Sequence, residues 1–153
     1  MEYRNHFYIT LFSNASQNTH PNNTLAEFTI QLAQRVDLGS KDNWEVGLCE
    51  FSCPHHKPVN ANKPLEVVGE TNALLYCDLI TPQFVGSYNV RCLRTFIHPS
   101  KYCEHRFDNV YYVPVQKHSF EDISIVITDM RGKKINFKPG ETPTKVVLHF
   151  RRV

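Results

Sequence analysis

The sequence predicts an all-β fold of the sandwich or barrel kind, and two features of its patterning support this. Apolar residues recur at every second position in several segments, as expected for strands that bury one face. Turn-forming Asn, Asp, Gly, Pro and Ser cluster between these segments, and no long window shows the apolar stripe of an amphipathic helix. A chain of 153 residues is expected to form one domain, over residues 1–153.

The strands are predicted from two kinds of segment. Strict alternation of apolar and polar residues covers residues 6–12, 26–32, 44–51, 123–129 and 145–152. Further strand-like runs, rich in β-branched and aromatic residues, cover residues 64–68, 73–80, 89–97 and 109–115. Together they amount to about nine short strands, at the spacing typical of a β-sandwich or barrel.

The segments between the strands carry turn signals. Residues 13–24 form a polar loop whose Ser, Asn and Thr side chains can bond to their own backbone. Residues 54–64 contain several prolines, which exclude a helix. Residues 129–134 predict a tight hairpin in which Gly132 adopts positive φ.

The run "ALLYCDLI" places one acid, Asp78, near the end of an otherwise apolar strand. Both faces of this strand are mostly apolar, so we expect it to be covered on two sides. Pro82 removes a ladder donor and Gly86 lets the chain turn. We expect Asp78 to accept hydrogen bonds from the turn or from an arginine such as Arg91 or Arg94.

The composition excludes several classes of partner. Lys and Arg number 17 and Asp and Glu 15, a formal net charge of +2, so no specific nucleic-acid binding is expected. No apolar run approaches the roughly 18 residues of a membrane span, and the N-terminus lacks a signal-peptide core, so the protein is not expected to be secreted. The cysteines are odd in number, which favours free thiols in a reducing compartment.

The strongest candidate for a metal cluster is "CPHH" at 53–56, which "CEH" at 103–105 could join. Their residue types suit zinc, and a structural site usually needs four ligands. Neither has the CxxC spacing of a structural zinc site, and we interpret both as exposed loop residues. The sequence thus predicts no metal and no other cofactor.

Catalysis is not indicated either. The sequence contains no Gly-x-Ser-x-Gly, P-loop or GxGxxG motif, and no context singles out a Cys–His nucleophilic pair. Asp78 with Asp129 or Glu50 would be a pair of acids, but each lies at or near a strand end. An acid in such a position usually caps a turn or meets a Lys or Arg. We therefore predict that the protein is not an enzyme.

The order of several segments resembles a known family. The segments "FYITLFSNASQNTHPNNTLAEFTIQLAQRVDL" and "WEVGLCEFSCPH" are similar to the N-terminal part of a protein of Polinton/Maverick-type elements and adintovirus-like viruses. The segments "LLYCDLITPQFVG", "YYVPV", "ISIVITDMRGKKINFKPG" and "VVLHFRR" are similar to its C-terminal part. The residues taken as structural motif positions are Trp44, Gly47, Asp78, Pro82, Gly86, Gly132 and Arg151.

This resemblance implies a fold and a role. Such elements resemble viruses with a double jelly-roll major capsid protein and a single jelly-roll penton, or minor capsid, protein. A chain of this length holds one jelly roll, a sandwich of about eight to ten antiparallel strands. The resemblance implies homopentamers at icosahedral vertices that contact the major capsid protein, within a virion assembled from protein made inside the host cell. Family members carry a longer insertion where this chain has only residues 53–72. The implied role of the core in assembly does not depend on that insertion.

A ring of five copies needs a heterologous interface, in which one surface meets a different surface of the next copy. Apolar residues expected on outward faces are candidates for it, namely Tyr8, Phe12, Phe51 and Tyr112. The alternative is a jelly-roll binding module that recognises a carbohydrate or a host protein, for instance through Tyr111 and Tyr112 in a groove. Fold does not decide between the two.

Overall fold

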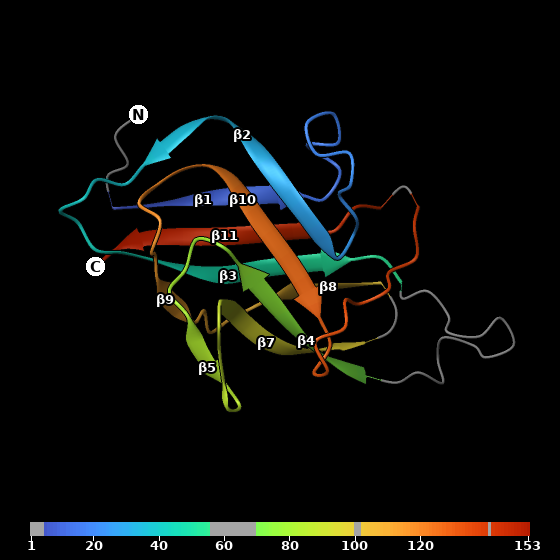
Figure 1. Ribbon diagram of the computed structural model, residues 1–153. Coiled ribbons are helices and arrows are strands. Elements are labelled where there is room, and N and C mark those ends of the chain that lie inside the picture. The colour runs from blue at the N-terminus through green and yellow to red at the C-terminus, as the bar shows by residue number, and fades with distance from the viewer. Residues whose placement is uncertain (1–4, 56–69, 100–101, 141) are drawn as a thin grey trace, which may run out of the picture.

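The computed structural model describes residues 5–55, 70–99, 102–140 and 142–153. Within these ranges every regular element is a β-strand (Figure 1), and no helix has the length and apolarity needed to cross a membrane. The strands are β1 (His6–Phe12), β2 (Glu27–Asp37), β3 (Trp44–Cys53), β4 (Glu70–Cys77), β5 (Gln83–Val85), β6 (Tyr88–Val90), β7 (Cys92–Pro99), β8 (Cys103–Arg106), β9 (Tyr112–Pro114), β10 (Ser119–Thr128) and β11 (Lys145–Arg152). The predicted all-β fold class is confirmed.

The strands form two antiparallel sheets and a small hairpin. The first sheet has the order β1-β11-β3-β8, and β9 also pairs with β3. The second sheet has the order β2-β10-β4-β7, and β5 pairs with β6 in the hairpin. Strands that are neighbours in a sheet come from distant parts of the chain, and the second sheet crosses in front of the first in Figure 1. Two facing sheets paired in this way are a jelly-roll sandwich, as predicted.

An apolar layer fills the space between the two sheets. Leu48 and Phe150 of the first sheet and Phe28 and Ile125 of the second are each at most 1% exposed. Burial of a side chain of this size contributes roughly 1.5–3 kcal/mol. These positions belong to the alternating segments, so the predicted inward faces of those strands are correct.

A bulge in β3 changes which of its side chains face this core. In the pairing with β11, Val147 lies opposite Glu50, but the next residue lies opposite Leu48, so Cys49 is extra. One extra residue shifts the two-residue period of a strand by one position. Phe51 therefore points inward and is 1% exposed, so its predicted place on an outward face is wrong.

The strand bounds agree with the prediction best at the two ends of the chain. β1 and β11 coincide with the predicted 6–12 and 145–152. β4 ends at Cys77, earlier than predicted, because the next two residues turn. The predicted strand at 89–97 is divided between β6 and β7. The predicted strand at 64–68 lies outside the described residues, as does most of the proline-rich loop before it.

Two glycines occupy turns that need positive φ. Gly132, with φ of 83°, lies in the turn where Asp129 N–H donates to the carbonyl of Lys133 at 2.8 Å. Gly86, with φ of 59°, lies between β5 and β6. Side-chain-bearing residues are strained in this conformation. The predicted turns at both glycines are confirmed. The strands β5 and β8 were not predicted, because segments of three and four residues are too short to show alternation.

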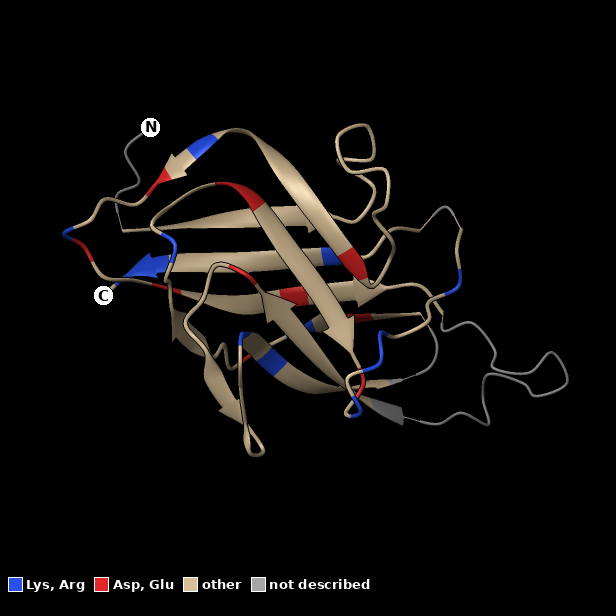
Figure 2. Cartoon of the chain, viewed as in Figure 1, with Lys and Arg blue, Asp and Glu red and all other residues tan. Residues whose placement is uncertain are grey.

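Charged residues are distributed over the whole sandwich. Figure 2 shows acidic and basic positions interspersed along the strands and loops. Several of them pair across strands, as Arg35 does with Glu121 at 3.1 Å and Lys145 with Glu50 at 3.3 Å. Exposed pairs of this kind contribute at most about 1 kcal/mol each, so the apolar core provides most of the stability.

Candidate functional site

A row of aromatic and imidazole side chains crosses the outer face of the first sheet. Tyr8 of β1 pairs with His149 of β11, His149 pairs with Gly47 of β3, and Gly47 pairs with Tyr112 of β9. We call Tyr8, His149 and Tyr112, together with the adjacent His6 and Arg151, the outer row. The Tyr8 and His149 rings stack with centroids 4.4 Å apart. The register of four strands thus assembles one continuous surface feature from both ends of the chain.

Hydrogen bonds hold the imidazole of His149 in place within the outer row. The Tyr112 hydroxyl lies 2.7 Å from His149 Nδ1, and His149 Nε2 lies 3.1 Å from His6 Nδ1. A neutral imidazole can accept from the hydroxyl and donate to His6 at the same time. Burial, followed by the nearby His6 and Arg151, lowers the pKa of His149 below its ordinary value. Burial raises the pKa of Tyr112.

Arg151 closes the row on one side. Its guanidinium lies over the Tyr112 ring, 3.4 Å from the centroid, and its Nε pairs with Glu45 Oε1. An arginine over an aromatic face gains electrostatic attraction from the ring quadrupole. Arg151, taken from the sequence as a motif residue, is thereby placed where it orients Tyr112.

Gly47 is required by a close approach of backbone rather than by its own φ. A Cβ atom at this position would lie 2.3 Å from Val110 Cγ1 and 2.9 Å from the carbonyl oxygen of Tyr111. The segment leading into β9 therefore packs directly on the outer face of β3. Absence of a side chain at Gly47 also leaves the gap across which Tyr112 reaches His149.

The exposed apolar residues fit the predicted interface set in part. Tyr8 is 59% exposed and Phe12 41%, both on the outer face of β1, whereas Tyr112 is half-buried. Phe84 and Tyr88, which are 80% and 75% exposed on the β5–β6 hairpin, lie outside the interface set expected from the sequence. Their position on either side of Gly86, a turn residue, could have indicated that both side chains are exposed on a hairpin.

Asp78 continues the hydrogen-bond ladder beyond the end of β4. Its N–H donates to the carbonyl of Ser124 at 3.3 Å, and its Oδ1 accepts from the Ser124 N–H at 2.9 Å. Its Oδ2 accepts from Lys117 Nζ at 3.2 Å. In a regular antiparallel ladder the Ser124 N–H would donate to the backbone carbonyl of Asp78, the residue opposite it. Here the side-chain carboxylate of Asp78 accepts that hydrogen bond instead.

The expected arginine partners of this carboxylate lie elsewhere. Arg91 donates to Gln116 Oε1 at 2.9 Å, and Arg94 donates to the carbonyl of Asn109 at 2.6 Å. Of the two expected sources of hydrogen bonds to Asp78, the turn or an arginine, the arginine is therefore wrong. The donors are the Ser124 N–H and Lys117. The lysine takes that place because the turn after β9 brings it to the strand end.

The two acids considered as partners for Asp78 also have structural contacts. Asp129 Oδ1 accepts from the N–H groups of Arg131 and Lys133, at 2.8 and 3.0 Å, and so caps its turn. Glu50 pairs with Lys145 at 3.3 Å. Each acid thus caps a turn or meets a basic side chain, as the position at strand ends predicted.

Trp44 anchors the beginning of β3. Its ring is 2% exposed, and its Nε1–H donates to the carbonyl of Leu38 at 3.1 Å. The indole thus satisfies its only polar group on the loop that connects β2 to β3. This motif residue therefore has a core role, distinct from the outer row.

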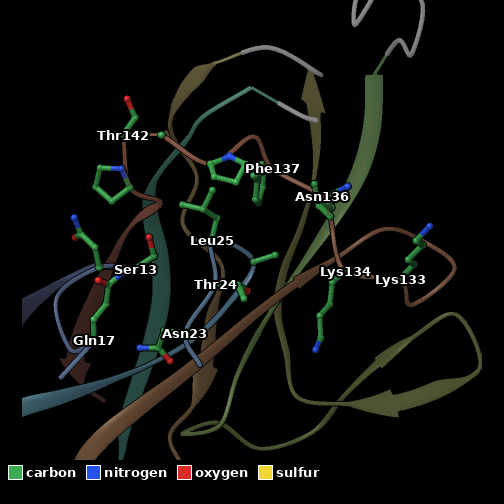
Figure 3. A pocket seen from close by; sticks show the side chains of 16 residues that line it. Ser13, Gln17, Asn23, Thr24, Leu25, Lys133, Lys134, Asn136, Phe137 and Thr142 are labelled. Atoms are coloured by element: carbon green, nitrogen blue, oxygen red, sulfur yellow. The ribbon is translucent and has the colours of Figure 1, made fainter. Parts of the chain in front are cut away.

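A pocket of about 590 Å³ opens at one end of the sandwich (Figure 3). One side of it is lined from the part of the chain between residues 13 and 26, and the other by residues 133–137, 139–140 and 142–143. Polar Gln17 and Asn136 lie at its wall together with apolar Leu25 and Phe137 in the close view. Its size lies within the range of small-ligand sites, which is about 300–1,000 Å³.

Several polar groups of this pocket are already engaged by the protein itself. The Asn23 side chain makes two hydrogen bonds to the backbone of Thr29, at 2.8 and 2.9 Å. Ser13 Oγ accepts from the Thr144 N–H at 3.0 Å, and Lys134 pairs with Glu27. These contacts brace the loop, so fewer groups are left to recognise a ligand.

A third feature is a cluster of sulfur and imidazole side chains at the ends of three strands. Cys53 Sγ lies 3.1 Å from His98 Nε2, and Cys103 Sγ lies 3.0 Å from His98 Nδ1. Cys53 and Cys103 are directly paired between β3 and β8, while His98 comes from β7 in the other sheet. Cys53 is fully buried, so its interpretation as an exposed loop residue is wrong.

The two thiols of this cluster titrate differently. Hydrogen bonding from Cys53, together with His98, lowers the pKa of Cys103 to about 5, against the opposing effect of burial. The same hydrogen bond to Cys103 and burial raise the pKa of Cys53.

Comparison with known proteins adds one finding to this geometry. No family model and no curated protein matches the sequence. Among solved structures, the crystal structure of the mavirus penton protein aligns over 97% of this chain and 100% of that chain, with a TM-score of 0.66. The identity is 8%, so the similarity concerns the fold. The chain has the fold of the mavirus penton protein, in agreement with the single jelly roll that its sequence resemblance implies.

Proposed function

We propose that the protein is a penton, or minor capsid, protein that forms homopentamers at icosahedral vertices and contacts the major capsid protein around it. The observation that carries this proposal is the fold similarity to the mavirus penton protein over almost the whole chain. The ordered resemblance of sequence segments to the same family is independent support. The role is structural, in a virion, with the protein made inside the host cell.

The surface offers features suited to assembly. Tyr8 and Phe12 lie on β1, an edge strand of the first sheet, and both are more than 40% exposed. Aromatic residues are enriched at the centres of protein interfaces. The outer row therefore supplies one half of a heterologous contact, and we assign it to the junction between neighbouring copies.

The decisive experiment is electron microscopy of the purified protein, alone and mixed with the major capsid protein. Rings with five-fold symmetry in either sample are the expected result. Particles that remain strictly monomeric in both samples, by microscopy and by light scattering, would overturn the proposal.

A binding module for a carbohydrate or a host protein is the second candidate, and the pocket favours it. Amide and hydroxyl groups beside an apolar floor are suited to a sugar ring, and Gln17 and Asn136 provide the amides. A glycan array separates the two candidates. Selective binding that Gln17→Ala abolishes would support the module, whereas an array without selective binding would leave the capsid role alone.

A further inference from the structure

The cluster of Cys53, His98 and Cys103 has no part in the proposed capsid role. One ligand atom from each residue lies within 4.8 Å of the others. Two of the residues come from the first sheet and the third from the second, so the cluster spans the sandwich. It lies where β3 ends, where β7 ends and where β8 begins.

The chemistry of these side chains is that of zinc ligands. Zinc prefers thiolate sulfur and imidazole nitrogen, in a tetrahedral arrangement without a directional preference of its own. A free cysteine is a weak hydrogen-bond partner. The buried imidazole of His98 is nevertheless flanked by a sulfur atom at each ring nitrogen.

The distances are compatible with one shared ion. Ligand atoms on a tetrahedral zinc lie about 3.4–3.8 Å apart, given Zn–S near 2.3 Å and Zn–N near 2.0 Å. The observed contacts of 3.0 and 3.1 Å are somewhat shorter than this spacing, and all three ligand atoms lie within 4.8 Å of one another. A turn of the His98 ring would direct one nitrogen between the two sulfur atoms.

A further imidazole is available for the fourth position. His105 lies on β8, two residues after Cys103, and its ring centroid is 5.8 Å from that of His98. Its Nε2 is buried and has no hydrogen-bond partner in the described part of the chain. A buried nitrogen left in this way carries an uncompensated desolvation cost, which a metal bond would offset.

We propose that Cys53, Cys103 and His98 bind a zinc ion that joins the two sheets at this end of the jelly roll. His105 or a water molecule completes the tetrahedron. The ion fixes the connection from β7 to β8 against the end of β3. Its function is structural, because Cys53 and His98 are buried, Cys103 is partly buried, and the three ligands come from three strands.

The test is metal analysis of the full chain, produced without a histidine tag and supplied with zinc sulfate. We expect one zinc per chain by native mass spectrometry and elemental analysis. Substitution with cobalt chloride should give the sulfur-to-metal charge-transfer absorption and strong visible bands of tetrahedral thiolate coordination. Cys53→Ser and Cys103→Ser should each lose the bound metal.

Cys49→Ser is the matched control, because Cys49 is also on β3 but its thiol donates to the carbonyl of Val147 at 3.3 Å. This variant should keep the zinc. Two results would overturn the proposal: wild-type protein without stoichiometric zinc, or zinc that persists in the Cys53→Ser/Cys103→Ser double variant. A Cys53–Cys103 disulfide found by mass spectrometry in protein purified under reducing conditions would overturn it as well.

A measurement on the wild-type protein avoids variants that fail to fold. Iodoacetamide labelling, followed by peptide mapping, compares the rate at which each cysteine is alkylated with zinc and after chelation. Zinc should protect Cys53 and Cys103 at least about tenfold while leaving Cys49 unchanged, since a metal-bound thiolate is a poor nucleophile. Equal rates with and without chelator would contradict zinc binding at this cluster.

Discussion

The hydroxyl of Tyr112 lies 2.7 Å from Nδ1 of His149, across a gap that Gly47 leaves open between them. This contact joins the short strand β9 to the C-terminal strand β11, although among the described strands β9 pairs with β3 alone. The arrangement of the outer row therefore depends on the absence of a side chain at Gly47. Substitutions in and around the outer row can show separately how it affects stability and how it affects assembly.

Gly47→Ala should destabilise the fold by about 1–3 kcal/mol, the usual cost of overpacking. The added methyl group would overlap Val110 and the Tyr111 carbonyl, which cannot move without displacing β9. Urea unfolding and the thermal midpoint measure this. Gly140→Ala is the control, because a Cβ there meets nothing within 4 Å. Equal stability of the two variants would contradict this prediction, because it would show that residues 110–111 can shift at little energetic cost.

The free energy of unfolding should fall as the pH is lowered, in part because of His149. Its pKa in the folded protein lies below the ordinary 6.5, so the unfolded chain binds more protons in the window beneath 6.5. The stabilisation is present above that value and is lost as the pH decreases through the folded pKa. Unfolding free energies measured between about pH 8 and about pH 5 should decline less steeply in His149→Gln.

The control for that pH series is His55→Gln, which alters an exposed histidine outside the outer row. It should reproduce the wild-type slope. An unchanged slope in His149→Gln would mean that other groups carry the acid sensitivity of the protein.

Asp78→Ala should destabilise the fold more than Asp78→Asn. The alanine variant leaves the Ser124 N–H without its acceptor and should cost about 1–3 kcal/mol. Asparagine retains an acceptor oxygen and loses only the partly exposed Lys117 pair, which is worth less than about 1 kcal/mol. Chemical denaturation ranks the variants. Unchanged melting temperature and assembly in both would refute a structural role for this acid.

Tyr8→Ser and Phe51→Ala should separate assembly from folding. Tyr8 is 59% exposed, so Tyr8→Ser should leave the thermal midpoint nearly unchanged and weaken pentamer formation. Phe51 packs against Phe96 with centroids 5.0 Å apart, so its truncation should cost about 3–5 kcal/mol of stability. Light scattering and calorimetry give the two readouts.

Met130→Ser provides the control for assembly, because Met130 is 64% exposed in the turn after β10. This variant should form pentamers as the wild type does. Normal pentamers from Tyr8→Ser would exclude the outer row from the junction between copies.

The elements whose signal is local could be predicted from the amino-acid sequence. Alternation of apolar and polar residues depends on the two-residue period of a strand, so β1 and β11 were predicted to the residue. The turns at Gly86 and Gly132 were likewise predicted, because positive φ strongly favours glycine. The resemblance of ordered segments then identified the jelly roll.

Properties that depend on the register between distant strands could not be predicted from local patterns. The bulge at Cys49 reverses the orientation of Phe51, and nothing in the local pattern of β3 marks it. The partner of Asp78 is a backbone group on β10, 46 positions away. Such contacts arise from strand pairing over long separations, where one residue of shift exchanges the two faces of a strand.

The sulfur and imidazole cluster shows the same division most clearly. The sequence indicated Cys53 in "CPHH" and Cys103 in "CEH" as members of one candidate cluster, but no motif pointed to His98. Antiparallel pairing of β3 with β8 brings the two cysteines together, and packing of the sheets adds the histidine. Local composition thus supplies the ligands, whereas the closure of the sandwich places them around one point.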